Sequence, residues 1–184
     1  MRLKRQALTD NECYQRGESL AQYLAAWPIY KRARNIAVYL PNDGEIDTGP
    51  LMDMIWRHKK TCYLPVLHGV LNNRLAFASW QPGEPLSGNR FGILEPDRMS
   101  ARLDRVYALD LVFMPLVAFD AEKNRLGMGG GYYDRTFEFL RYRKVWKKPA
   151  LVGLAHDFQQ QPGLPVEPWD VPLQAVVTNA GIIE

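Results

Sequence analysis

Short apolar runs that alternate with segments of helical periodicity are the feature that most restricts how this 184-residue chain can fold. The runs are bounded by proline, glycine or charged residues, as buried strands are. Strands are expected at residues 36–40, 61–67, 74–80, 111–119, 150–155 and 174–178. Strands that alternate with helices predict an α/β fold, in which a layered sheet pairs its strands in parallel.

Helices are expected between these strands. Thr9 and Glu12 match a capping box, in which the two side chains satisfy the first free amides of a helix. Pro28 is expected to end that helix, and Thr48 or Asp47 to cap the next one. The apolar positions that define the three helices are Cys13, Gly17, Leu20, Ala21 and Leu24, then Leu51, Met54 and Ile55, then Tyr133, Phe137 and Leu140.

Composition restricts the class of protein. Hydrophobic residues make up 47% of the chain and charged residues 23%, which is ordinary for one globular domain, and no linker divides residues 1–184. The net charge of +3 is too mild to require nucleic acid as a partner. The basic clusters at residues 31–34 and 141–148 are typical of solvated surfaces. Residues 81–110 are rich in proline, glycine and charge, which predicts a loop with one short element.

The cysteines and the termini bear on localisation. Cys13 and Cys62 lack the spacing of a disulfide framework or a zinc site. No apolar stretch approaches the ~20 residues that cross a bilayer, and the basic N-terminus precedes no apolar core of a signal peptide. We therefore expect a cytoplasmic protein that does not bind membranes.

A glycine-rich segment at residues 127–131 stands between the apolar run 111–119 and the third predicted helix. Glycine allows positive φ and the close approach of a ligand, and free amides at the start of a helix attract anions. The segment has neither the spacing of the dinucleotide fingerprint nor the lysine of a Walker A loop. It predicts a phosphate-binding turn, with a tight structural turn as the alternative.

Charged residues flank this segment and occur in two other loops. Arg125 is placed to clamp a phosphate, unless it faces solvent within its turn. Asp134 either complements the helix dipole or binds Mg²⁺, which favours one or two carboxylates together with ligand phosphates. Asp170 either caps a turn or supplies a second carboxylate for that metal. Glu45 either is exposed, while Asp47 caps a helix, or accepts hydrogen bonds from the N–H groups of a heterocycle.

The expected location of this chemistry is the carboxyl end of the sheet. In open α/β sheets ligands gather in the loops that follow the parallel strands, here residues 41–48, 119–132 and 156–170. His156 and Asp157 close a strand there, but no nearby serine or cysteine nucleophile suggests a catalytic triad. Aromatic residues that either stack on a planar ligand or fill the core are Tyr39, Tyr132, Tyr133, Phe158 and Trp169.

The glycine segment with its neighbours closely resembles the signature of 5-formyltetrahydrofolate cyclo-ligases, also called methenyltetrahydrofolate synthetases. The matching stretches are Pro115-Leu-Val-Ala-Phe-Asp and Arg125-Leu-Gly-Met-Gly-Gly-Gly-Tyr-Tyr-Asp-Arg. Further blocks similar to this family follow the same order from about residue 5 onward. They are Val38-Tyr-Leu-Pro, Gly44-Glu-Ile-Asp-Thr, Tyr63-Leu-Pro-Val, Gly153-Leu-Ala-His-Asp-Phe-Gln, Leu164-Pro-Val, Trp169-Asp and Val176-Val-Thr.

The resemblance implies a three-layer α/β/α sandwich with a mostly parallel central sheet and Rossmann-like topology. It also implies an ATP- and Mg²⁺-dependent closure of 5-formyltetrahydrofolate to 5,10-methenyltetrahydrofolate, with release of ADP and phosphate. The formyl oxygen would attack the γ-phosphate, N10 would close the ring, and phosphate would leave. A monomer that binds these small molecules is the expected active form.

The resemblance also assigns roles by matching position. Catalytic roles fall on Arg125, Tyr132 and Asp134. Asp134 and Asp170 would hold Mg²⁺, and Leu40, Glu45, Tyr132 and Tyr133 would contact the folate. ATP would contact Lys4, Arg5, Arg125, Leu126, Gly127, Met128, Gly129, Gly130, Gly131, Tyr132 and Tyr133.

The N-terminus departs from the family pattern. Similar proteins carry a longer basic segment ahead of the stretch that matches residues 4–8, whereas this chain begins almost at that stretch. Either Arg2, Lys4 or Arg5 takes over the nucleotide contacts, or the start is truncated and ATP binding is weak. The alternative function is therefore a non-catalytic folate-binding protein that has lost ATP use. A third reading, a sugar-phosphate isomerase or CoA-transferase of similar fold, leaves Tyr-Tyr-Asp-Arg at residues 132–135 unexplained.

Overall fold

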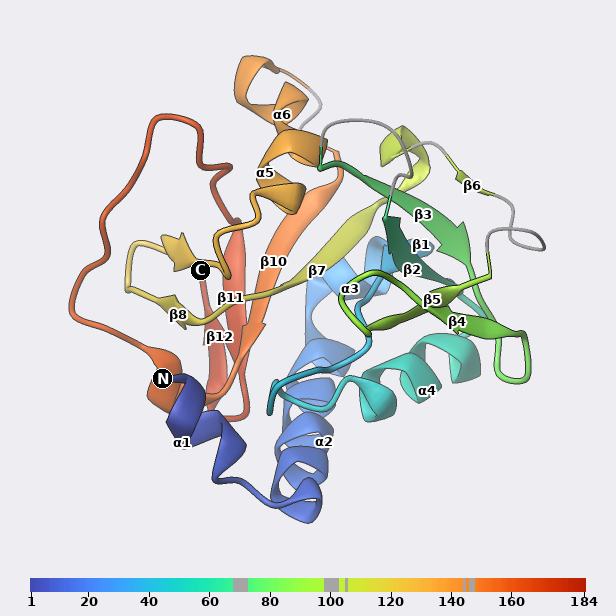
Figure 1. Cartoon of the computed structure of the whole chain (residues 1–184), viewed down its shortest axis with the longest axis horizontal. Coiled ribbons are helices and arrows are strands. Elements are labelled where there is room, and N and C mark those ends of the chain that lie inside the picture. The colour runs from blue at the N-terminus through green and yellow to red at the C-terminus, as the bar shows by residue number, and fades with distance from the viewer. Residues whose placement is uncertain (68–72, 98–102, 105, 144, 146–147) are drawn as a thin grey trace.

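The computed structural model describes residues 1–67, 73–97, 103–104, 106–143, 145 and 148–184 (Figure 1). The helices are α1 (Arg2–Gln6), α2 (Asp10–Ala26), α3 (Pro28–Arg32), α4 (Gly49–Arg57), α5 (Tyr132–Phe137) and α6 (Phe139–Tyr142), with 3₁₀ turns η1 (Val106–Ala108) and η2 (Asp157–Gln159). The strands are β1 (Asn35–Ala37), β2 (Thr61–Leu67), β3 (Leu75–Ser79), β4 (Leu86–Gly88), β5 (Leu94–Pro96), β6 (Leu103–Asp104), β7 (Leu111–Pro115), β8 (Ala118–Phe119), β9 (Arg125–Leu126), β10 (Ala150–Ala155), β11 (Ala175–Thr178) and β12 (Gly181–Ile183).

A sheet of eight strands runs through the molecule in the order β12-β11-β10-β7-β1-β2-β3-β6 (Figure 1). The strands from β11 to β2 in this order pair in parallel, and β12, β3 and β6 join antiparallel at the two sides. Counted in chain order, the parallel strands run 2-1-3-4-5 across the sheet, so the connections reverse direction between β1 and β7. The predicted α/β fold with a mostly parallel central sheet is confirmed.

Alternate residues of each strand face opposite sides of the sheet. On β7, Leu111 and Phe113 belong to the core shared with α2 and α4, whereas Val112 and Met114 belong to the core that contains Phe137 of α5. The sheet is therefore the middle of three layers. Because both faces are covered, β7 and β10 are buried along their length and carry continuous apolar runs without polar alternation.

The apolar run 111–119 forms two strands and not one. β7 ends at Pro115, and β8 pairs with β9 in a separate hairpin. The run stays apolar across the break because Ala118 and Phe119 are buried as deeply as β7 itself. Apolar patterning reports burial, so it does not reveal where the chain leaves the sheet. The break places Arg125, on β9, in a hairpin beyond the carboxyl end of β7.

Several other elements differ from the predictions in extent. β1 is shorter than the predicted strand 36–40, and the third helix is divided at Glu138 into α5 and α6. The predicted loop 81–110 contains the β4–β5 hairpin, β6 and η1. α2 ends before Pro28 as predicted, but Pro28 also begins α3, because proline at the first helical position gives up no intrahelical hydrogen bond. None of the described helices is both long enough and apolar enough to cross a membrane.

The predicted helix caps are present. Thr9 and Glu12 form the complete capping box of α2. At α4, Thr48 occupies the N-cap position, but Asp47 makes the capping contact, since its Oδ1 accepts the amide N–H of Gly49 at 2.7 Å. Thr48 instead donates from its hydroxyl to the carbonyl oxygen of Tyr39 at 2.7 Å. Both side chains therefore fix the loop that carries Glu45 between β1 and α4.

α2 lies directly against this loop. A Cβ atom on Gly17 would lie 2.2 Å from the carbonyl oxygen of Asp47, far inside van der Waals contact. Gly17→Ala is therefore expected to lower the free energy of unfolding by about 2 kcal/mol, although alanine is the better helix former by about 1 kcal/mol. Urea denaturation measures the change, with Gln15→Ala at an exposed position of the same helix as the control. A Gly17→Ala protein as stable as the wild type would contradict the close approach.

Candidate active site

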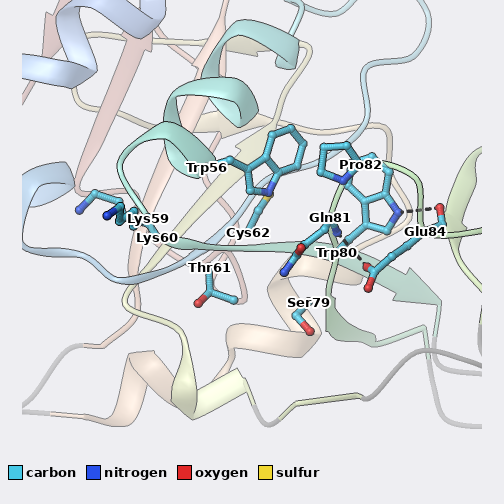
Figure 2. Close-up of a pocket in the computed structure, with 10 residues that line it drawn as sticks. All are labelled: Trp56, Lys59, Lys60, Thr61, Cys62, Ser79, Trp80, Gln81, Pro82 and Glu84. Atoms are coloured by element: carbon cyan, nitrogen blue, oxygen red, sulfur yellow. Dashed lines mark hydrogen bonds between the residues drawn. The ribbon is translucent and has the colours of Figure 1, made fainter.

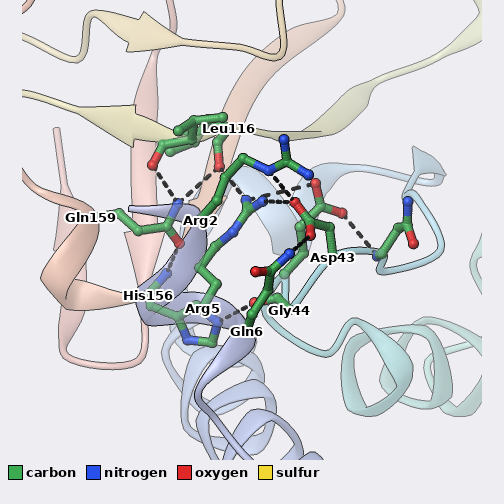
Figure 3. Close-up of polar contacts among 11 residues, drawn as sticks. Arg2, Arg5, Gln6, Asp43, Gly44, Leu116, His156 and Gln159 are labelled. Atoms are coloured by element: carbon green, nitrogen blue, oxygen red, sulfur yellow. Dashed lines mark hydrogen bonds and ion pairs between the residues drawn. The ribbon is translucent and has the colours of Figure 1, made fainter.

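The loops after β1, β7 and β10 meet at the carboxyl end of the sheet, as expected for neighbouring parallel strands. His156 Nε2 lies 3.1 Å from the carbonyl oxygen of Gly44, which joins the loop after β10 to the loop after β1. Gln159 donates from Nε2 to the carbonyl oxygens of Leu116 and Val117, both at 2.9 Å, which joins it to the loop after β7 (Figure 3). These loops at the carboxyl end of the sheet form the candidate active site.

The glycine segment, residues 127–131, connects β9 to α5. Gly129 and Gly131 adopt left-handed φ angles of 84° and 62°, so side chains there would be strained. Leu126 and Met128 are exposed, which leaves the outer side of the segment open to a ligand. α5 has only six residues. The local backbone amides, rather than a long helix dipole, are therefore what the segment offers to an anion.

Arg125 and Asp134 form an ion pair at the two ends of the glycine segment. Their side chains are 8% and 16% exposed, which excludes a solvent-facing Arg125. Asp134 Oδ1 also accepts the amide N–H of Val171 at 3.2 Å. The Nε of Arg125 is buried and has no hydrogen-bond partner among the described residues. An unpaired buried donor beside an open glycine segment suits an anionic ligand.

Asp170 lies at the end of the loop after β10, next to Val171. Its Oδ2 accepts the amide N–H of Glu167 at 2.9 Å, which is the turn-capping geometry. Because Val171 contacts Asp134, the two carboxylates predicted to bind a metal lie on adjoining stretches of chain. Among the described residues, no group of three or more metal-binding side chains occurs. Two carboxylates suit Mg²⁺ when ligand phosphates complete its coordination.

Glu45 lies in the loop after β1, and its side chain is 14% exposed. Oε2 accepts the amide N–H of Asn42 at 3.1 Å, and Oε1 lies 3.9 Å from Nη1 of Arg5. Burial raises the pKa of Glu45 to about 7, although the Asn42 amide and Arg5 oppose the rise. A ligand that donates hydrogen bonds to this carboxylate would stabilise its ionised form.

Two tyrosines connect Glu45 with the glycine segment. The Tyr39 hydroxyl is buried and has no hydrogen-bond partner among the described residues. Burial raises the pKa of Tyr39 and of Tyr133, and the charge of Glu45 raises both further. The charge of Arg125 lowers the pKa of Tyr133. Tyr133 therefore lies within electrostatic range of Glu45, which is predicted to contact the folate, and of Arg125, which is predicted to contact ATP.

Tyr132 and Leu40 lie beside this cluster. The Tyr132 hydroxyl contacts Arg90 and donates to Oδ1 of Asn73 at 3.3 Å, and its ring meets Phe91 edge to face. Tyr132 thus reaches toward the turn of the β4–β5 hairpin, which sequence patterning did not connect with the site. Leu40 is half-buried and packs against the core shared with α2 and α4.

The two basic residues predicted for the nucleotide have different surroundings. Lys4 is exposed, whereas the side chain of Arg5 is only 1% exposed. The Arg5 guanidinium donates to Oδ2 of Asp43 at 3.0 Å and to the carbonyl oxygen of Leu116 at 3.2 Å (Figure 3). The structure therefore brings Arg5 to the loop that carries Glu45.

Buried polar residues whose roles were not predicted hold the loops together. Asp120 accepts the amide N–H groups of Asn124 at 2.9 Å and Leu164 at 3.0 Å, which ties the β8–β9 hairpin to the loop after β10. His156 and Gln159 are fully buried and make the contacts described above. Asp120 and His156 each follow directly after a buried apolar strand, and a polar residue at that position is the sequence signal that marks them.

A hollow lies on the side of the sheet where β2 begins, away from the candidate site. Trp56 and Trp80, whose ring centres are 5.6 Å apart, line one part of a cavity of about 470 Å³, and Lys59 and Lys60 line another (Figure 2). The cavity adjoins Thr61 at the start of β2, whereas the candidate site lies at the carboxyl ends of the strands. No residue predicted for the site lines this cavity.

The fold and the site define a doubly wound α/β protein with a glycine segment, the Arg125–Asp134 ion pair and the half-buried carboxylate of Glu45 in the loops at the carboxyl end of its sheet. The model of the 5-formyltetrahydrofolate cyclo-ligase family matches residues 1–179. The chain therefore belongs to this family of enzymes, as its sequence blocks predicted.

Individual relatives agree with this membership. The 5-formyltetrahydrofolate cyclo-ligase of Escherichia coli (strain K12) is 42% identical over 100% of this chain and 99% of its own length. That of Haemophilus influenzae is 42% identical over 90% of this chain and 87% of its own length. The NMR structure of Aquifex aeolicus 5,10-methenyltetrahydrofolate synthetase matches with a TM-score of 0.78 and 31% identity, over 98% of this chain and 87% of that one.

Proposed function

We propose that this chain catalyses the ATP- and Mg²⁺-dependent cyclisation of 5-formyltetrahydrofolate to 5,10-methenyltetrahydrofolate, with ADP and phosphate as the other products. Membership of the cyclo-ligase family and the names of the relatives support the folate reaction. The observation that carries the proposal is the buried Arg125, with its unpaired Nε, beside the glycine segment at the same end of the sheet as Glu45. It supports a pocket in which a phosphate-binding side and a folate-binding side adjoin.

Arg125 and the glycine segment form the proposed ATP side. The unpaired Nε of Arg125 and the amides of residues 127–131 would bind the phosphates. Phosphoryl transfer depends mainly on positioning and on charge neutralisation, which these groups can supply. Asp134 and Asp170 would hold Mg²⁺, which, when bound, neutralises negative charge on the phosphates.

Glu45 is the centre of the proposed folate side. Its carboxylate would accept hydrogen bonds from N–H groups of the folate heterocycle, and such charge-assisted bonds are strong in a poorly solvated site. Tyr39 and Tyr133 are close enough for Glu45 to shift their pKa values, so both would border the bound heterocycle. Leu40 would form an apolar part of the pocket wall.

The proposed reaction has two steps. The formyl oxygen attacks the γ-phosphorus of ATP, and the bond to the β-phosphate oxygen breaks to release ADP. N10 then attacks the formyl carbon and gives up its proton to solvent, and the carbon–oxygen bond breaks with phosphate as the leaving group. The task of the protein is to hold the formyl oxygen close to the γ-phosphate, because such positioning replaces a bimolecular encounter.

Incubation of the protein with 5-formyltetrahydrofolate, ATP and Mg²⁺ tests the proposal. We expect one ADP and one phosphate for each methenyl product, and no product when either ATP or Mg²⁺ is omitted. Folate binding without phosphate release would support the non-catalytic folate-binding protein instead. Turnover of a phosphosugar or a thioester without ATP would support an isomerase or a transferase.

Asp134→Asn is expected to raise the Mg²⁺ concentration that gives half-maximal activity about tenfold, because one charge-assisted contact is lost. A Mg²⁺ titration at saturating ATP measures this shift, and Asp170→Asn in parallel reports the second carboxylate. If the Asp134→Asn titration matches the wild type, Asp134 only positions Arg125 and the backbone at Val171.

A further inference from the structure

Three side chains of α1 converge on a single carboxylate. Arg2 donates from Nε to Oδ2 of Asp43 at 2.6 Å, and Arg5 donates from Nη2 to the same oxygen at 3.0 Å. Gln6 donates to the other oxygen, Oδ1 (Figure 3). Both carboxylate oxygens of Asp43 therefore accept hydrogen bonds from α1, and Asp43 lies two residues before Glu45.

The backbone at this point is unusual. Asp43 and Gly44 adopt consecutive left-handed φ angles of 53° and 67°, which turns the chain sharply before Glu45. A Cβ atom at Gly44 would lie 2.6 Å from the backbone carbonyl carbon and oxygen of Arg5, so α1 is pressed against the turn. A left-handed non-glycine residue persists only where its surroundings determine the conformation. Here α1 supplies those surroundings.

His156 holds the same turn from the other side. Because a carbonyl oxygen can only accept, His156 donates from Nε2 to the Gly44 carbonyl at 3.1 Å. Its ring is fully buried and stacks on Phe158, with ring centres 5.1 Å apart. Gln159 of the same loop shares the Leu116 carbonyl oxygen with Arg5. Contacts from α1 and from the loop after β10 thus fix the backbone that precedes Glu45.

We propose that Arg5, Asp43 and His156 are positioning residues that fix Glu45 in the geometry required to bind the folate. This inference rests on the proposed function, in which Glu45 binds the folate heterocycle. It assigns Arg5 to the folate side of the pocket and not to the nucleotide, because its guanidinium is buried between Asp43, Glu45 and Leu116.

Asp43→Asn tests the clamp with little disturbance of the backbone, because asparagine tolerates left-handed φ better than most residues. The substitution removes the charge that pairs with Arg2 and Arg5. We expect KM for 5-formyltetrahydrofolate to rise about tenfold. We expect kcat and KM for ATP to stay within about twofold of the wild type. The control is Lys148→Ala, which breaks an exposed ion pair to Asp110 at the opposite edge of the sheet and is expected to change none of these constants.

A double variant of Asp43 and Glu45 separates a positioning role of Asp43 from a general structural role. If Asp43 acts through Glu45, Asp43→Asn adds no further increase to the folate KM in a Glu45→Gln background. Additive increases, or a rise confined to the KM for ATP, would overturn the proposal. Calorimetry of folate binding without ATP is measured for the same variants. If the wild type shows no turnover, the proposed function fails by itself, and the calorimetric comparison of Asp43→Asn with the wild type still decides whether the clamp supports folate binding.

Discussion

Arg125→Ala is expected to lower kcat/KM for ATP about 100-fold, while the affinity for 5-formyltetrahydrofolate stays within about twofold of the wild type. Arg125 is the buried cation beside the glycine segment, and its Nε has no partner among the described residues. Alanine removes both that donor and the positive charge that would meet the phosphates. Phosphate release at varied ATP measures the first quantity, and calorimetry with folate alone measures the second.

The effect on binding has to be separated from an effect on stability, because Arg125 also neutralises Asp134. Leaving the half-buried carboxylate of Asp134 without its partner costs up to about 3 kcal/mol of unfolding free energy, which lowers Tm. Arg125→Lys is the matched variant, since it keeps a charge near Asp134 but loses the planar fork, and its expected loss for ATP is about tenfold. Equal losses of ATP and folate affinity in the lysine variant, at an unchanged Tm, would contradict the assignment of Arg125 to the nucleotide.

The central sheet could be predicted because its strands are buried on both faces. β7 and β10 therefore carry continuous apolar runs, which stand out from the surrounding sequence. β4 and β12 are three residues long and contain no fully buried residue, so each is too short to show the alternation typical of a strand. The strands that the sequence did not predict are therefore short ones outside the buried centre of the sheet.

The sequence predicts individual candidate residues but not the contacts among them. Glycines before a helix and charged residues at strand ends are local features, so Arg125 and Glu45 can be proposed as site residues from the chain alone. The partner of Arg5 could not, because Asp43 lies 38 positions away and the contact forms only when α1 packs on the loop after β1. A basic residue near the N-terminus has the same sequence signal whether it binds a phosphate or a carboxylate.

Glu45→Gln is expected to raise KM for 5-formyltetrahydrofolate about 30-fold at a pH of about 8, where the wild-type carboxyl is ionised. KM for ATP is expected to stay unchanged, because Arg125 and the glycine segment remain in place. Towards a pH of about 6 the difference between the two proteins shrinks, since the wild-type carboxyl then takes up a proton. A change confined to the KM for ATP would refute the placement of Glu45 on the folate side.

Glu45→Gln is expected to weaken folate binding but to raise the free energy of unfolding, so a folding defect would be easy to recognise. The Glu45 carboxyl keeps its proton up to about pH 7 in the folded protein, but only up to its ordinary pKa of 4.5 in the unfolded chain. Between these values the folded state binds more protons at this carboxyl, so the contribution of Glu45 to wild-type stability falls as pH rises. The pKa of Asp43 is lowered to about 2 by hydrogen bonds from Arg2 and Gln6, so Asp43 titrates below this window. Burial lowers the pKa of His156 from its ordinary 6.5 to about 4, so its contribution to stability rises with pH between these values, and this contribution cancels when the Glu45→Gln protein is compared with the wild type.

Glutamine does not titrate, so the Glu45→Gln protein is expected to gain about 2 kcal/mol of unfolding free energy relative to the wild type between about pH 5 and about pH 8. Urea denaturation at the two pH values measures this gain. A variant that binds folate more weakly at pH 8 and yet resists urea better there has lost a binding contact and not its fold. Parallel pH profiles for the two proteins would instead mean that Glu45 is well solvated in the folded state, and its proposed role as a buried acceptor would have to be abandoned.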